Sequence, residues 1–297
     1  MDRQDFIITV YLLVCEHYQA IKAHYPLRRG GFAPALTDEE VITIEICGEY
    51  FKLARDEDIF AYFQAHYQDW FPQLRDRSLF VRQAANVWQV KALIQQRLTQ
   101  VSGQAADPVQ VIDTLPLPVC VLTRAPRDRC FKPHADYGYC AAKQLHYYGF
   151  KLGLRVARSG MIIHYPLLPA RPHDVQLTDE LVADFAGVVS ADKGFIDAVR
   201  QALLAERQGV TLVTPPRQRM QAAFAPAVLK TCARWRKRVE TVGSHLTERF
   251  AVARIRVRAL WHLQHRLIRK ILAHTVGVFL NLQCGRKPLD LDGLLSA

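Results

Sequence analysis

Three acidic residues occupy positions from which carboxylates could share metal ions. Asp113 follows the apolar run 109–112, Asp192 follows the apolar run 188–191, and Glu240 lies on a segment of helical spacing. Carboxylate oxygens are the ligands that Mg²⁺ and Mn²⁺ prefer, and two such ions roughly 3.5 to 4 Å apart can hold the attacking and leaving oxygens of a phosphodiester in line. A strand-end aspartate can equally be a cap or an ion-pair partner. The three acids are therefore candidate ligands for two Mg²⁺ or Mn²⁺ ions.

Glu240 stands at the edge of a predicted buried stripe, and Arg236 lies one helical turn before it on the same side. This placement predicts a carboxylate with a basic neighbour at the border of the core. The stripe itself comprises Val239, Val242, Leu246 and Phe250.

The two aspartates belong to a region where short β-rich runs alternate with amphipathic segments. This alternation predicts an α/β fold, a mixed sheet with flanking helices, in which catalytic groups usually lie at strand ends. Residues 158–160 have the composition of a hairpin turn. We expect strands over residues 109–113, 150–157, 161–168, 188–192 and 210–213, and helices over 174–185 and 196–207.

The first hundred residues predict a small all-helical domain, for DNA binding or dimerisation. Thr37 and Glu40 have the spacing of a capping box, which predicts a helix over 38–53. Further helices are expected over residues 6–18, 58–66 and 78–98, the last beginning at a Ser78 cap. Near the other end of the chain, residues 260–282 predict a helix that closes the core, with Leu263, Leu267, Ile271 and Phe279 facing inward.

The net charge of +11 makes a polyanion a plausible partner. The excess is concentrated between residues 217 and 270, where 14 Lys or Arg stand against two acids. A solvated basic face without a ligand is the alternative interpretation. The 7 cysteines have no regular spacing, and no apolar stretch reaches the ~20 residues of a membrane span. We therefore expect a soluble protein in a reducing cytoplasm.

Other polar residues have competing interpretations. Asp174 comes just before an amphipathic run and is predicted to cap a helix, whereas Asp197 is predicted to lie in the first turn of the next helix, where the macrodipole favours a negative charge. Lys193 could reach a phosphate or belong to a plain turn. The irregular segment 123–148 combines basic and aromatic residues, so it could contact DNA or fold onto the sheet. Its Cys130, His134, Cys140 and His146 lack the tight spacing of a structural zinc site, and no zinc is predicted.

Five short motifs, read in order, resemble the DDE transposases of bacterial insertion sequences. The resemblance spans roughly residues 105 to 285 and is strongest to insertion-sequence family 982, with families 4 and 5 as relatives. The motifs are 111–114 (Val-Ile-Asp-Thr), 148–154 (Tyr-Gly-Phe-Lys-Leu-Gly-Leu), 171–174 (Arg-Pro-His-Asp), 191–195 (Ala-Asp-Lys-Gly-Phe) and 236–240 (Arg-Lys-Arg-Val-Glu).

The resemblance implies an RNase H-like catalytic domain over 105–285, preceded by the helical domain 1–104 and followed by a tail 286–297. It implies that Asp113, Asp192 and Glu240 bind the metal pair and cut and join DNA at the ends of the element. It also implies a homodimer on paired DNA ends, with no membrane and no small-molecule cofactor. The residues expected to bind DNA are Lys193, Arg236, Arg238, Arg217, Arg219, Arg127, Arg129 and Lys132.

Two positions depart from the broader pattern of these enzymes. Thr247 stands where a lysine is expected seven positions after the glutamate, and Ala233 stands where a tyrosine would precede the arginine. Two other functions remain open: a transposase-derived DNA-binding protein that has lost catalysis, and an RNase H-fold nuclease with another class of substrate.

Overall fold

The computed structural model describes residues 1–27, 30, 33–141 and 144–295. The chain forms two compact units. Unit 1 comprises Met1–Val101 together with His245–Ala297, and unit 2 comprises Ser102–Ser244. Among the described residues, no helix has both the length and the apolar character that a bilayer crossing requires.

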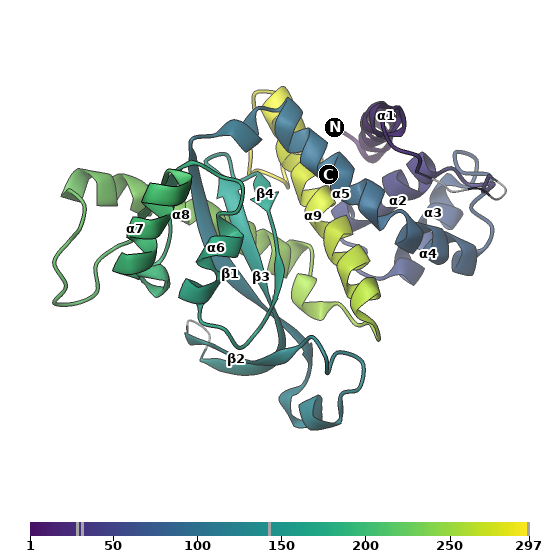
Figure 1. Ribbon diagram of the computed structural model, residues 1–297. Helices are drawn as coiled ribbons and strands as arrows, with labels where there is room; N and C mark the ends of the chain where they lie inside the picture. The colour runs from purple at the N-terminus through teal and green to yellow at the C-terminus, as the bar shows by residue number, and fades with distance from the viewer. Residues whose placement is uncertain (28–29, 31–32, 142–143, 296–297) are drawn as a thin grey trace. The chain divides into compact units, whose positions relative to one another are not determined.

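Unit 1 is helical and contains elements from both ends of the sequence (Figure 1). Helix α9 packs against α5 and α2, so residues far apart in the chain share one core. Its helices are α1 (Arg3–Lys22), α2 (Asp38–Tyr50), α3 (Asp56–Tyr67), α4 (Arg77–Asn86), α5 (Trp88–Val101) and α9 (Leu260–Gln283), with the short turns η6 (His245–Arg249) and η7 (Val252–Arg254).

The C-terminal helix is where it was predicted, but its packing differs from the prediction. Leu263, Leu267, Ile271 and Phe279 are buried as expected. They lie in unit 1, whereas the sequence assigned residues up to 285 to the catalytic domain. Periodicity identifies the apolar face of a helix but does not identify the surface that covers it.

The predicted cap of helix α2 is confirmed, whereas the predicted cap of helix α4 is wrong. The Glu40 backbone N–H donates to Thr37 Oγ1 at 3.2 Å and the Thr37 N–H donates to Glu40 Oε2 at 2.7 Å, which is the predicted capping box. The predicted single helix 78–98 is instead two helices, because the chain breaks at Val87. The cap of α4 is Asp76, which accepts the Leu79 N–H, and not Ser78.

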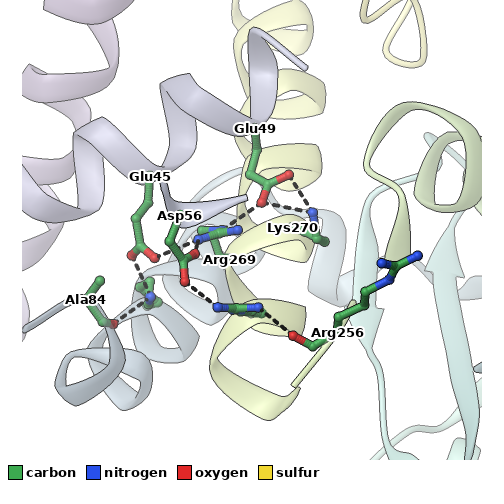
Figure 2. Close-up of polar contacts among 9 residues, drawn as sticks. Glu45, Glu49, Asp56, Ala84, Arg256, Arg269 and Lys270 are labelled. Atoms are coloured by element: carbon green, nitrogen blue, oxygen red, sulfur yellow. Dashed lines mark hydrogen bonds and ion pairs between the residues drawn. The ribbon is translucent and has the colours of Figure 1, made fainter. Parts of the chain in front are cut away.

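The interior of unit 1 contains a network of buried charges (Figure 2). The Arg269 guanidinium donates to Glu49 at 2.6 Å and to Asp56 at 2.5 Å. Lys91 and Lys270 pair with Glu45 and Glu49 at 2.6 and 2.8 Å. Pairing offsets the cost of removing these charges from water.

Unit 2 is an α/β unit built on a mixed sheet of strand order β2-β3-β1-β6-β7 (Figure 1). Strands β1, β6 and β7 are parallel, and β3 is antiparallel to β1. Strands β4 and β5 pair with β3. The strands are β1 (Val109–Cys120), β2 (Asp136–Cys140), β3 (Leu145–Ala157), β4 (Ile162–His164), β5 (Leu167–Pro169), β6 (Gly187–Ser190) and β7 (Val210–Val213).

Helices cover this sheet and complete its core. A cluster including Ile112, Val189, Leu204 and Leu212 joins the strands to helix α7, while α8 packs along β1, β3 and β6. The helical elements are η1 (Gln104–Ala106), η2 (Leu122–Arg127), η4 (Asp174–Leu177), α6 (Thr178–Leu181), η5 (Lys193–Phe195), α7 (Ala198–Gln208) and α8 (Pro226–Ser244).

The strand predictions are correct in position and wrong in some lengths. The hairpin at 158–160 is confirmed, with Gly160 at φ 90° in a region that suits glycine. Strand β1 continues seven residues past its predicted end, so Asp113 lies inside the strand and not at its end. The extension pairs with β3 along its length, which the apolar pattern of β1 alone does not encode. The segment predicted as irregular, 123–148, includes the β2–β3 hairpin.

Candidate active site

The parallel pairing of β1 and β6 aligns the two aspartates. Val111 pairs with Ser190 in the register of these strands. Continuing that register by two residues brings Asp113 level with Asp192, at the carboxyl end of β6. Neighbouring parallel strands therefore deliver two carboxylates to one edge of the sheet, where ligand sites of α/β folds are found.

Helix α8 brings Glu240 and Arg236 to the same place. Ser190 Oγ donates to the Cys232 carbonyl at 3.4 Å, which fixes the helix one turn before Arg236 against the end of β6. Arg236 Nη2 lies 3.3 Å from Asp192 Oδ1 and 3.7 Å from Glu240 Oε1. The guanidinium thus holds together one acid from the sheet and one from the helix.

Asp113 is in the least hydrated position of the three acids. Burial raises its pKa to about 6, and the negative charges of Asp174 and Asp192 act in the same direction. The Thr114 N–H, which donates to Asp113 Oδ1 at 2.8 Å, and the Arg236 guanidinium oppose that rise. The raised pKa reflects mainly the burial of the carboxyl group, and a bound cation would favour its charged form.

Asp174 belongs to this site, and the sequence prediction of a helix cap was wrong. The cap position of η4 is His173, and Asp174 Oδ1 accepts instead from Lys151 Nζ at 2.9 Å and from Thr114 Oγ1 at 3.0 Å. Lys151 Nζ also donates to the Pro172 carbonyl at 2.7 Å. Asp174 therefore accepts a hydrogen bond from Thr114, the residue whose backbone N–H donates to Asp113.

One sequence signal could have identified this contact. Lys151 and Arg155 are the two charges inside the apolar run 150–157, and both are buried. A buried lysine requires an acidic partner, and Asp174 follows on the next segment.

The donor set suits a hard divalent cation, although two of its members, Asp192 and Glu240, pair with Arg236. Oxygen ligands from two strands and one helix are the chemistry that Mg²⁺ and Mn²⁺ favour. Among the described residues, no group of three or more His, Cys, Asp or Glu side chains is already drawn together as a metal site. Asp192 and Glu240 are part-exposed, with 44% and 57% of their side-chain surfaces accessible, so they have room to turn away from Arg236 toward a cation.

The basic residues predicted to bind DNA fall into two groups in unit 2. Near Asp192, exposed Lys193 begins η5 and its carbonyl accepts from Arg217 Nη2 at 3.4 Å. Exposed Arg219 follows on the same connection, and exposed Arg238 lies on α8. The second group lies between β1 and β2, where the exposed residues Arg127, Arg129 and Lys132 are found.

Residues 103–260 match the family model described as "Transposase DDE domain", which covers more than half of the chain. The chain belongs to the DDE transposase family. The match includes almost all of unit 2 and the residues Asp113, Asp192 and Glu240.

Comparison with solved structures relates this DDE transposase to the piggyBac transposase in a synaptic complex with hairpin DNA, studied by cryo-electron microscopy. The two chains are 12% identical with a TM-score of 0.43, and the similarity covers 98% of this chain and 78% of the piggyBac chain. No curated protein is significantly similar to this transposase in sequence.

Proposed function

We propose that this transposase cuts DNA at the ends of an insertion sequence and joins those ends to a target, using Asp113, Asp192 and Glu240 as metal ligands. The observation that supports this proposal best is the meeting of the three acidic positions around Arg236. Two Mg²⁺ or Mn²⁺ ions bound there would activate the attacking oxygen and neutralise charge on the leaving oxygen.

The chain's own residues supply binding and orientation. Arg236 lies beside both exposed acids, so it can transfer its contacts to a DNA phosphate when those acids take up cations. Lys193, directly after Asp192, is placed to contact the same backbone. Asp174 acts as a positioning residue. It accepts a hydrogen bond from the Thr114 hydroxyl, and the Thr114 backbone N–H in turn donates to the Asp113 carboxylate.

The wider DNA interface includes residues from both basic groups. Phosphate contacts by these residues would make DNA binding strongly salt-dependent. They are Arg217, Arg219 and Arg238 near the site and Arg127, Arg129 and Lys132 beyond β1. We also propose an RNase H-like assignment for unit 2, supported by its mixed sheet and flanking helices. We further propose that the transposase belongs to insertion-sequence family 982 or its relatives and acts as a homodimer on paired DNA ends. Its proposed location is the cytoplasm, in association with the nucleoid.

The variant Glu240→Gln tests the catalytic assignment. It removes one ligand charge and retains the size of the side chain, so we expect cleavage to fall roughly a thousandfold or more. DNA binding is expected to stay within a few-fold of the parent. The assay measures Mg²⁺-dependent cleavage of a plasmid that carries the DNA flanking the gene, with binding measured in parallel by fluorescence anisotropy.

Exposed Glu248, eight residues further on, provides the matched control, and Glu248→Gln should cut like the parent. Equal cleavage by the Glu240→Gln variant and the parent would contradict the assignment. If the parent itself does not cut, the chain is a DNA-binding descendant of a transposase. If it cuts junctions or hybrids without regard to the flanking sequence, it is a nuclease of another substrate class.

A further inference from the structure

The β2–β3 hairpin carries two tilted pairs of aromatic rings on one face. Tyr137 pairs with Tyr148 and Tyr139 pairs with His146 in the antiparallel register. The ring centroids lie 5.2 Å apart in the first pair and 4.6 Å in the second. Because residues two apart on a strand share a face, the four rings form a row, which we call the aromatic row.

The β2 side of the aromatic row is exposed, whereas Tyr148 on β3 is buried. Tyr137 and Tyr139 are 49% and 51% exposed, although tyrosine rings are usually covered in a folded protein. The opposite face of the hairpin is covered by the chain itself, since a Cβ at Gly138 would lie 2.8 Å from Ala170 and 2.9 Å from the Tyr147 ring. Packing within the protein therefore accounts for the opposite face of the hairpin and for Tyr148, but not for the exposure of Tyr137 and Tyr139.

Positive charge lies on the connection that leads into this hairpin. Arg124, Arg127, Arg129 and Lys132 are all exposed on the residues between β1 and β2. The acid among them, Asp128, accepts the backbone N–H groups of Cys130 and Phe131 and so is engaged in the turn. Exposed cations on this connection and exposed rings on the hairpin that follows it together suit a ligand with both phosphates and flat bases.

The aromatic row belongs to the same sheet as the candidate active site. Tyr148 pairs with Cys120, seven residues beyond Asp113 along β1. At roughly 3.3 Å per strand residue the separation is about 23 Å, which corresponds to about seven nucleotides at the ~3.4 Å rise of a DNA strand. A DNA strand bound at Asp113 can therefore reach the β2–β3 hairpin within one turn of the DNA helix.

We propose that the aromatic row binds unpaired nucleobases of the DNA that the transposase processes. Tyr139 and Tyr137 stack on bases, while Arg127, Arg129 and Lys132 neutralise the backbone. Stacking on tyrosine is open to any base, because every base has a π-face, so this binding is independent of sequence. The proposal rests on the proposed function, in that it assigns the DNA strand the role of ligand.

The test compares single-stranded and duplex DNA with the full-length protein in EDTA, so that cleavage does not contribute. The probes are a fluorescein-labelled oligo(dT), longer than the ~4–16 nucleotides of a typical single-strand site, and a labelled duplex of equal length. The paired substitution Tyr137→Leu with Tyr139→Leu should weaken oligo(dT) binding about tenfold or more and change duplex binding less than about threefold. The matched Tyr→Phe pair retains the rings and should bind like the parent.

Several outcomes would overturn the proposal. Unchanged oligo(dT) affinity in the Leu variant, an equal loss for both forms of DNA, or a loss in the Phe variant as large as in the Leu variant would each do so. A dimer that becomes a monomer in the Leu variant, without a change in oligo(dT) affinity, would assign the row to self-association instead. The melting temperature of each variant controls for folding.

These outcomes are separate from the test of catalysis. Glu240→Gln is expected to bind oligo(dT) like the parent, because binding is measured without metal. Normal cleavage by Glu240→Gln would refute the catalytic assignment and leave the aromatic row standing, whereas loss of cleavage with unchanged binding in the Leu variant would refute only the row.

Discussion

At the scale of single residues, the acid with the most distinctive environment is Asp113. Its pKa is raised from 3.8 to about 6, with burial as the main cause. Between pH 3.8 and about 6, the Asp113 carboxyl is therefore protonated in the folded protein and ionised in the unfolded chain. The free energy of unfolding falls as the pH rises through this range, and the stability contributed by the protonated carboxyl is lost above a pH of about 6. The metal-free site is thus destabilising at neutral pH.

Replacing this carboxyl should stabilise the metal-free protein. We expect Asp113→Asn to raise the free energy of unfolding by on the order of 1–3 kcal/mol at a pH of about 7.5 and to have little effect near pH 4. Urea unfolding in EDTA at the two pH values measures the difference. Exposed Asp69 provides the control, since Asp69→Asn should change stability little at either pH. A variant less stable than the parent at the higher pH would contradict the electrostatic interpretation.

The contacts of Asp174 give a second prediction for single residues. Asp174→Ala removes the partner of buried Lys151 and of Thr114, so we expect a loss of stability of about 1–3 kcal/mol and at least a tenfold loss of cleavage. Asp174→Asn retains an oxygen for both donors and should recover part of the loss in cleavage. Thermal melts and the plasmid assay measure the two effects.

The control is Asp179→Asn, on the next helical segment, where a 62%-exposed side chain pairs with Arg200. It should leave cleavage unchanged. Cleavage at the parental rate in Asp174→Ala would show that the residue is structural only.

At the scale of elements, helix α8 combines two functions on opposite faces. Val239 and Val242 are buried against the sheet, while Arg234, Lys237 and Arg238 are exposed. The buried face places Glu240 and Arg236 at the end of β6, and the exposed face presents a line of cations next to that site. One helix therefore supplies a candidate metal ligand and a candidate phosphate-binding surface.

The exposed face of α8 should control the salt dependence of DNA binding. Loss of one phosphate contact in Arg238→Gln should reduce the slope of log affinity against log salt by about 1, for any DNA sequence. Arg207→Gln, an exposed arginine at the end of α7, should leave the slope unchanged. Titrations at several salt concentrations measure both slopes. Equal reductions in the two variants would indicate non-specific attraction instead of a defined contact.

At the scale of the whole molecule, some of the basic residues are buried in ion pairs and others are exposed. Part of the basic excess at 217–270 is internal to unit 1, because Arg266, Arg269 and Lys270 pair with Asp56 and Glu49 of the N-terminal helices. Burial acts to raise the pKa of Asp56, but the Arg269 and Arg266 guanidinium groups hold it well below its usual value. These cations join segments about 200 residues apart and are not available to DNA.

Breaking this buried network should destabilise unit 1 strongly. Arg269→Met leaves Glu49 and Asp56 without their shared partner, and we expect a loss of about 3–5 kcal/mol in the free energy of unfolding. Exposed Arg82→Met on α4 is the control and should change stability by less than about 0.5 kcal/mol. Similar denaturation midpoints for the two variants would show that the buried pairs contribute little.

The sequence by itself determined the local elements and the three acidic positions. Hydrophobic periodicity and the Thr37 capping box identified helices, and the apolar runs before Asp113 and Asp192 located two parallel strands. These signals are local, because each depends on residues within a turn or a strand of one another.

Tertiary structure decided which distant residues became partners. It extended β1 past Asp113, placed Asp174 in the candidate active site instead of at a helix cap, and placed α9 with the N-terminal helices. It also separated the cations that are exposed from those buried in pairs. Such contacts depend on which surfaces meet once the chain is folded, and neither the spacing nor the composition of one segment encodes its partner.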